Sequence, residues 1–172
     1  MHIALERCTV RSWRRGDEAS LVRHANNRNV WINLRDRFPH PYTPDDAARW
    51  MVWVRSERPE TNFAIAVNDD AVGGIGYEIQ PDVHRVSAEI GFWLGQSCWG
   101  RGIMTDAVRA VTEHAMRTHH LARVYASVFE WNPASMRVLE KAGYEREAVL
   151  RRSAVKDGRV IDQVLYAFTR ES

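Results

Sequence analysis

Hydrophobic and polar residues follow alternating and helical patterns that predict a chain of mixed strands and helices. The first strand is expected at residues 5–11, and a helix is expected to follow at residues 16–26. Residues 29–43 show no clear period and are expected to be irregular. Thr43 followed by Pro44 then predicts the N-cap and first residue of a second helix. The apolar residues on one face of this helix are Ala47, Trp50, Met51 and Val54.

The middle of the chain carries strand patterns and then a strong helical pattern. Residues 62–67 and 72–80 flank the polar turn 68–71, so they are expected to pair as a hairpin. Residues 86–94 alternate and predict a further strand. A loop that contains glycines then leads into a helix at residues 102–118, which presents one apolar stripe.

The last third of the chain combines strands with one short helix. Residues 124–128 have the pattern of a short apolar strand, and residues 133–142 have that of an amphipathic helix, which Gly143 is suited to end. Two final strands are expected at 144–153 and 160–168, joined by a polar turn. The order of elements predicts an α/β fold with a mixed sheet of about seven strands and helices on both faces.

Length and composition favour a single cytoplasmic domain. The chain has 172 residues, 45% of them hydrophobic, and no long linker or repeat, so residues 1–172 are expected to form one domain. No segment approaches the roughly 20 apolar residues that span a membrane, and the N-terminus lacks the apolar core of a secretion signal. A net charge of +2 gives little reason to expect a nucleic-acid partner. Cys8 and Cys98 lack metal-ligand and redox spacing, so no metal is expected.

A strand, a glycine loop and a helix follow one another directly between residues 86 and 118. Gly100 and Gly102 let the backbone approach a ligand, and the first free amides of the helix would point toward an anion placed there. Arg101 adds a positive charge at the same point, so a pyrophosphate is the natural ligand. The alternative is a tight strand-to-helix turn in which the glycines serve geometry alone.

A second motif, Asn132-Pro133-Ala134-Ser135, opens the helix at 133–142. An N-cap followed by proline at the first helical position explains the asparagine structurally. Together, however, the two motifs make the chain resemble the GNAT superfamily of N-acetyltransferases, and within it the ribosomal-protein N-terminal acetyltransferases. The likeness extends from Arg7 to Phe168. Its other matching pieces are Pro39-His40-Pro41-Tyr42-Thr43, Glu89-Ile90-Gly91-Phe92-Trp93-Leu94, Trp99-Gly100-Arg101-Gly102-Ile103-Met104-Thr105-Asp106-Ala107 and Glu140-Lys141-Ala142-Gly143-Tyr144.

The resemblance implies an acetyl-CoA-dependent N-acetyltransferase that needs no metal and acetylates a primary amine. In this superfamily the fourth and fifth strands, here 86–94 and 124–128, splay apart to form a V-shaped cleft. Backbone groups at Phe92–Leu94 are then expected to pair with the pantetheine arm, and amides of the glycine loop are expected to hold the pyrophosphate. The residues that the resemblance assigns to the cofactor are Phe92, Trp93, Leu94, Trp99, Gly100, Arg101, Gly102, Ile103, Met104, Asn132, Ser135 and Lys141.

The resemblance also implies a direct attack of the amine on the thioester, without an acyl-enzyme. Glu89 is the candidate base because it lies on the strand that enters the cleft, and its alternative role is that of a solvated or salt-bridged strand residue. Ser135 is the candidate that protonates or hydrogen-bonds the departing sulfur, and the amide near Leu94 is the candidate oxyanion donor. Leu139 occupies the position at which many relatives carry a tyrosine acid.

The acceptor amine is expected at the opposite mouth of the cleft. Its candidate contacts are Trp31, Phe38, His40 and Tyr42, for which a role in the hydrophobic core is the alternative. A protein or peptide N-terminus and a small amine both stay open as acceptors, because Ser153-Ala154-Val155 stands where some N-terminal acetyltransferases carry a glutamate. A non-catalytic acyl-CoA-binding module is a further alternative, and homodimers are common on this fold.

Overall fold

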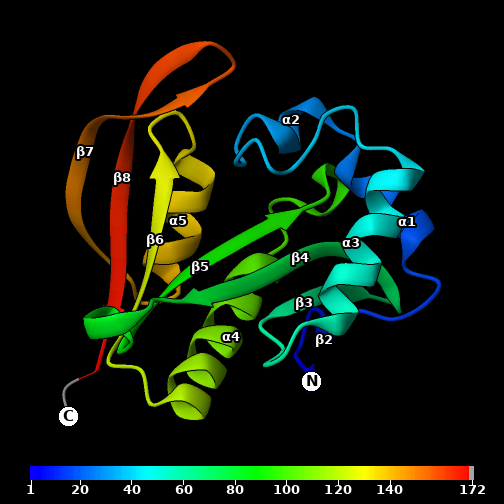
Figure 1. The fold of residues 1–172 in the computed structure, drawn as a ribbon, viewed down its shortest axis with the longest axis horizontal. Helices are drawn as coiled ribbons and strands as arrows, with labels where there is room; N and C mark the ends of the chain where they lie inside the picture. Colours follow the sequence, from blue (N-terminus) through cyan, green and yellow to red (C-terminus); the bar gives the residue numbers. More distant parts are fainter. Residues whose placement is uncertain (171–172) are drawn as a thin grey trace. The chain divides into compact units, whose positions relative to one another are not determined.

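The computed structural model describes residues 1–170 and contains a mixed sheet with helices, which confirms the predicted α/β class (Figure 1). The eight described strands follow the order β1-β2-β3-β4-β5-β6-β8-β7. In chain order the elements are β1 (His2–Ala4), β2 (Thr9–Ser12), α1 (Glu18–Ala25), α2 (Arg28–Trp31), α3 (Pro44–Ser56), β3 (Asn62–Val67), β4 (Asp70–Ile79), η1 (Asp82–His84), β5 (Ser87–Leu94), η2 (Gln96–Cys98), α4 (Ile103–His119), β6 (Arg123–Phe129), α5 (Pro133–Lys141), β7 (Glu145–Lys156) and β8 (Arg159–Thr169).

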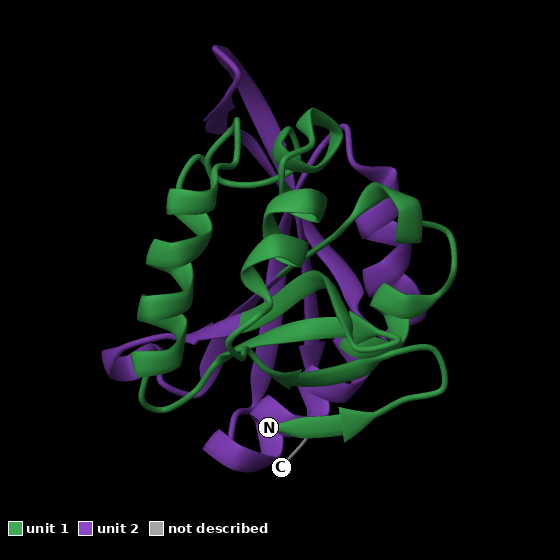
Figure 2. Ribbon diagram, turned by 90° about the vertical axis from the view of Figure 1, so that its right-hand side faces the viewer, with its two compact units in different colours: residues 1–76, 92–107 green, residues 77–91, 108–172 purple. Residues whose placement is uncertain are grey.

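The chain forms two compact units, which Figure 2 shows in different colours. The first unit contains residues 1–76 and 92–107, and the second contains residues 77–91 and the chain from residue 108 onward. Strands β4 and β5 and helix α4 each have residues in both units. The whole predicted cofactor loop and all of the predicted acceptor contacts therefore belong to the first unit.

The first unit is built on an antiparallel meander of β1, β2, β3 and β4. Val10 of β2 lies opposite Ile3 on one side and Ile65 on the other. The hairpin predicted for residues 62–80 is confirmed, and its turn residues Asn68 and Asp69 have φ angles of +49° and +71°. Two consecutive positive φ angles match the right-handed twist of paired strands, and asparagine and aspartate tolerate them better than most residues do.

The opening of the chain differs from the single strand predicted at residues 5–11. Two short strands form instead, joined by a turn in which the amide of Leu5 donates to the carbonyl of Cys8 at 2.8 Å. β1 contains only three residues and is exposed at both ends, so no alternating pattern marks it in the sequence. The described sheet accordingly has one strand more than predicted.

Helix α2 was also missed, because residues 29–43 were expected to be irregular. This helix has four residues, which is too short to show a helical period. The Asn27 side chain caps it by accepting a hydrogen bond from the Asn29 amide at 2.8 Å. The Thr43 N-cap of α3 is confirmed, since Thr43 Oγ1 accepts from the Asp46 amide at 3.2 Å and the Asp46 carboxylate accepts from the Thr43 amide at 2.8 Å.

A buried cluster joins helices α1 and α3 to strands β3 and β4 and forms the core of the first unit. Apolar contacts of this kind supply most of the stability of short amphipathic helices. The buried members of the cluster are Trp13, Leu21, Ala25, Tyr42, Ala47, Met51, Val54, Ala64 and Ala71.

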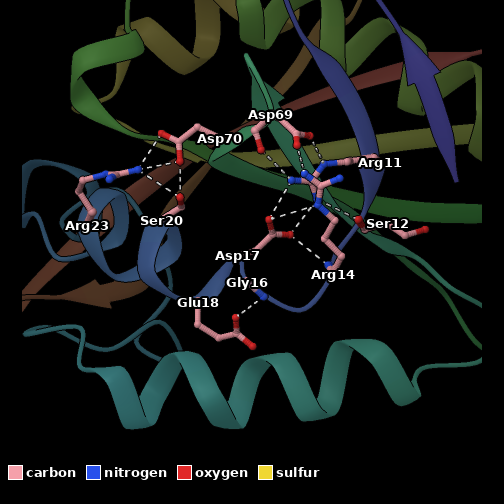
Figure 3. Close-up of polar contacts among 10 residues, drawn as sticks. All are labelled: Arg11, Ser12, Arg14, Gly16, Asp17, Glu18, Ser20, Arg23, Asp69 and Asp70. Atoms are coloured by element: carbon pink, nitrogen blue, oxygen red, sulfur yellow. Dashed lines mark hydrogen bonds and ion pairs between the residues drawn. The ribbon is translucent and has the colours of Figure 1, made fainter.

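A polar network ties the β3–β4 turn to the segment before α1, as Figure 3 shows. The Arg11 guanidinium donates two 2.8 Å hydrogen bonds to the carboxylate of Asp17, and both side chains are 6% exposed. Arg11 also donates to the Asp69 carbonyl at 3.2 Å. A short distance away, Asp70 accepts hydrogen bonds from Ser20 and from the more exposed Arg23.

The second unit contains β6, α5, β7 and β8, together with parts of β4, β5 and α4. β5 and β6 pair in parallel from Ser87↔Arg123 to Glu89↔Tyr125, and both strands continue beyond this ladder. β6 pairs with β8 and β8 with β7, in antiparallel fashion. β7 runs to Lys156, beyond its predicted end, because a register shift near Arg152 allows pairing to resume. Within residues 1–170, no helix has the length and hydropathy needed to cross a membrane.

Candidate functional site

The loop before α4 contains the two glycines from which the sequence predicted an anion site. Gly100 and Gly102 have φ angles of +73° and +77°, a region that glycine enters without steric cost. A Cβ atom at Gly100 would meet nothing within 4 Å, so the backbone is open to a ligand at this point. Arg101 is exposed beside these glycines, and α4 begins at Ile103. Open backbone, a cation and the first amides of a helix together fit the diphosphate of coenzyme A.

Arg7 lies against the same loop and was not predicted from the sequence as a site residue. A Cβ atom at Gly102 would be 3.3 Å from the Arg7 side chain. Arg7 Nη1 donates to Asp106 Oδ2 at 2.8 Å, and this hydrogen bond raises the pKa of the Arg7 guanidinium. No local pattern could have found the contact, because it joins the β1–β2 turn to a helix 99 residues further along the chain.

The end of β5 is held firmly on both sides. On one side, the Trp99 indole donates to the Leu94 carbonyl at 2.7 Å. On the other side, a Cβ atom at Gly73 would be 2.5 Å from the Trp93 carbonyl oxygen, and one at Gly74 would be 2.7 Å from Trp93 Nε1. Trp93 and Leu94 therefore occupy space that β4 leaves open by having glycine at both positions.

The predicted acceptor contacts fall into two aromatic groups. In the first, Phe38 packs against Tyr42 and Trp93 with ring centroids 5.0 Å and 5.4 Å away. In the second, Trp31 stacks on His40 with centroids 5.6 Å apart. Tyr42 is only 5% exposed, and burial raises the pKa of its hydroxyl to about 12. Tyr42 is thus mainly a core residue. Phe38, which was also predicted to contact the acceptor, is partly accessible.

In the second unit, Glu89 lies on the face of β5 that its strand position predicted. Ala88 and Ile90 are buried on the opposite face, with exposed fractions of 0% and 3%, while Glu89 is half-buried. Glu89 is opposite Tyr125 at the last position of the parallel ladder with β6. Glu89 is therefore the last residue of β5 that pairs with β6 in this ladder.

Asn132 and Ser135 are brought together at the start of α5. Asn132 Oδ1 accepts from the Ser135 amide at 3.1 Å, and Asn132 Nδ2 donates to Ser135 Oγ at 2.9 Å. The N-cap role is therefore confirmed, and it orients the Ser135 hydroxyl as well. Lys141 is exposed at the other end of the same helix, and Leu139 is fully buried where many relatives carry a tyrosine.

The two cysteines do not pair with each other in the described part of the chain. Cys8 and Cys98 are both buried and free. Burial raises the pKa of the Cys8 thiol to about 11, which suppresses its thiolate at neutral pH. Within residues 1–170, no group of three or more histidine, cysteine, aspartate or glutamate residues is placed to hold a metal ion.

Comparison with known proteins gives a consistent assignment. The family model of the acetyltransferase (GNAT) domain matches residues 7–145. The ribosomal protein uS5-alanine N-acetyltransferase of Escherichia coli (strain K12) is 32% identical over 165 residues, which cover 92% of this chain and 82% of that protein. The structure of Mycobacterium smegmatis RimJ in complex with CoA-disulfide is 26% identical, with a TM-score of 0.82 over 94% of this chain and 81% of the other.

A further solved structure supports the fold alone. RimL, a ribosomal L7/L12 alpha-N-protein acetyltransferase in complex with coenzyme A, has a TM-score of 0.85 over 98% of both chains at 18% identity. The sequence matches and the glycine loop before α4 point to the same chemistry. The chain belongs to the GNAT acetyltransferase family, and it is an N-acetyltransferase whose acetyl donor is acetyl-CoA.

Proposed function

We propose that this enzyme acetylates the N-terminal amine of a protein or peptide. The observation that carries the proposal is the 32% identity, over 92% of the chain, to an enzyme named for acetylation of an alanine of ribosomal protein uS5. The half-buried Phe38 and Trp93 support it, because an apolar surface suits the side chain next to a peptide N-terminus better than it suits a hydrated polycation.

The first unit is proposed to bind the donor through its loop. When bound, acetyl-CoA supplies a thioester whose carbonyl carbon accepts the amine. Amides from Trp99 to Met104 and the Arg101 side chain are proposed to hold the diphosphate. Phe92, Trp93 and Leu94 are proposed to pair with the pantetheine arm through their backbone, and the Leu94 amide to hydrogen-bond the thioester oxygen.

The second unit is proposed to supply the groups that handle protons. Glu89 would accept the proton that an ammonium must lose before it can act as a nucleophile, directly or through water. Ser135 would hydrogen-bond the departing sulfur, with its hydroxyl oriented by Asn132 at 2.9 Å. Asn132 is also proposed to contact the pantetheine arm. Lys141 lies at the end of α5, where a solvated surface role is favoured, and contact with the phosphates or ribose is its alternative role.

No nucleic-acid or membrane partner is part of the proposal, and a cytoplasmic enzyme is expected. A net charge of +2 and a ribosomal-protein acetyltransferase relative fit this expectation. A homodimer is compatible with the fold, and sedimentation of the purified protein would establish the oligomeric state.

The proposal is tested by the release of free coenzyme A thiol from acetyl-CoA. Peptides that begin with alanine, serine or methionine are compared with polyamines, amino sugars and free amino acids. Turnover of one or more peptides with a kcat/KM at least tenfold above that of every small amine supports the proposal. The opposite preference would assign the enzyme to small amines, and tight binding of acetyl-CoA without any transfer would indicate a non-catalytic module.

A further inference from the structure

The side chain of Gln96 connects two parts of the first unit: the segment between β5 and α4, which is proposed to bind the donor, and helix α2, which is proposed to contact the acceptor. Gln96 begins η2, in the connection between β5 and α4. Its Oε1 atom accepts a hydrogen bond from Asn27 Nδ2 at 2.8 Å and another from Asn29 Nδ2 at 3.1 Å. Gln96 Oε1 thus accepts hydrogen bonds from two side chains at the start of α2.

Helix α2 cannot be stable alone, so it depends on contacts with the rest of the unit, among them its buried residue Val30 and the hydrogen bonds to Gln96. Its four residues allow about one turn, far below the length at which isolated helices form in water. Asn27 caps the helix through Oδ1 while it donates to Gln96 through Nδ2, so one side chain fixes both the first turn and its attachment. Asn29 continues the chain of contacts, since its carbonyl accepts from Asn33 Nδ2 at 2.9 Å.

The support at Gln96 is itself anchored. The preceding residue, Gly95, is buried and donates its amide to the Val72 carbonyl at 2.8 Å. A Cβ atom at Gly95 would be 2.5 Å from His24 Nδ1, so the end of α1 packs directly on this turn. Gln96 therefore projects from a backbone that these contacts hold in place.

Helix α2 carries a predicted acceptor contact at its last residue. Trp31 stacks on His40, and the Arg28 guanidinium lies 5.3 Å from the centre of the Trp31 ring. A rotation of this single turn would displace Trp31 and the segment that follows. The orientation of the aromatic pair hence depends on the two hydrogen bonds at Gln96.

We infer that Gln96 is a positioning residue that sets the orientation of α2 and thereby the affinity for the acceptor. The inference rests on the proposed function, because it takes Trp31 and His40 as acceptor contacts. The required chemistry is specific. Both asparagine amides donate, so the residue at position 96 must present an acceptor, which glutamate can do and leucine cannot.

The test compares Gln96→Leu with Gln96→Glu, using the intact enzyme and the best peptide acceptor found. Gln96→Leu is expected to raise the KM for the peptide about three- to tenfold, the range for loss of exposed hydrogen bonds, with kcat and the Kd for acetyl-CoA within about twofold of wild type. Gln96→Glu is expected to restore the KM. Gln80→Leu is the matched control, since Gln80 donates to the backbone carbonyl of Glu78 in the second unit.

Hydrogen exchange provides a readout that does not need an acceptor. Amides of residues 28–42 are expected to exchange faster in Gln96→Leu than in wild type, Gln96→Glu and Gln80→Leu. Unchanged exchange in Gln96→Leu would overturn the inference, and so would equal weakening of peptide and acetyl-CoA binding. If the wild-type enzyme acetylated no peptide, the proposed function would fail by itself, and the exchange data would still decide whether Gln96 positions α2.

Discussion

The indole nitrogen of Trp99 donates a 2.7 Å hydrogen bond to the carbonyl oxygen of Leu94. This contact closes the connection between the last residue of β5 and the glycine loop before α4. Trp99 is nevertheless 44% exposed, so the apolar effect contributes less to its position than it does for a core tryptophan. The hydrogen bond therefore has a large part in fixing the loop relative to the strand end.

Replacing Trp99 by phenylalanine tests this role. Trp99→Phe keeps an aromatic ring and removes the N–H donor, so the Kd for acetyl-CoA is expected to rise about three- to tenfold as the loop loses its fixed geometry. Isothermal calorimetry measures the change. Trp53→Phe on α3 is the control, because Trp53 is 50% exposed and its ring packs on Trp50. Equal affinity in wild type and Trp99→Phe would show that the hydrogen bond is not needed for donor binding.

The space at Gly95 allows a second prediction. Gly95→Ala would place a methyl group 2.5 Å from His24 Nδ1, and both residues are packed in the first unit. The overlap is expected to lower the free energy of unfolding by about 1–3 kcal/mol, as overpacking does elsewhere. Urea denaturation measures this loss. Gly91→Ala is the control, because a methyl group at Gly91 would meet nothing within 4 Å. A Gly95→Ala protein as stable as Gly91→Ala would contradict the packing described for His24.

Two of the ion pairs in Figure 3, Arg11–Asp17 and Arg23–Asp70, should differ strongly in their energetic effect. Asp17→Asn leaves the Arg11 guanidinium buried without its carboxylate, and such a loss is expected to cost about 3–5 kcal/mol of unfolding free energy. Arg23→Gln removes a partner of Asp70. The Arg23 side chain is 60% exposed, so the expected loss of unfolding free energy is below about 1 kcal/mol. Chemical denaturation of both variants checks the contrast, and similar losses would show that burial does not separate the two pairs.

Local sequence patterns predicted the elements that have a full period or a cap. The hairpin at 62–80 and the cap at Thr43 are confirmed because turn geometry and capping act over a few residues. Helix α2 and strand β1 were missed because four and three residues are too few for a pattern. Their positions are set by tertiary contacts, such as the hydrogen bond from Asn27 to Gln96 and the pairing of β1 with β2.

The same distinction holds for the candidate site. Gly100, Gly102 and Asn132 could be singled out because each has a conformation or a cap that few residue types provide. Arg7 and Gln96 could not, since their partners are distant in sequence and their own neighbours carry no periodic signal. The burial of Tyr42 could not be predicted from the sequence either, because an aromatic residue after proline fits either a core or a binding surface.

The raised pKa of Cys8 predicts resistance to alkylation. Burial disfavours the thiolate and raises the pKa to about 11, so only about one thiol in a thousand is ionised at pH 8. Iodoacetamide at pH 8 is expected to label Cys8 slowly in the folded protein. Labelling is expected to be rapid in urea, where the pKa of an unfolded cysteine thiol is about 8.5. Peptide mass mapping measures the label at each cysteine. Rapid labelling of Cys8 in the native protein at pH 8 would refute the burial-induced shift.

The pH dependence of the reaction tests Glu89 as the proposed base. Glu89→Gln removes the carboxylate that is proposed to accept a proton from the acceptor ammonium, and kcat is expected to drop by about 10²–10⁴. Glu145→Gln is the control, a change at an exposed glutamate at the start of β7 in the same unit. Steady-state rates across the pH range on one peptide provide the comparison, and an unchanged profile and kcat in Glu89→Gln would leave proton removal to water.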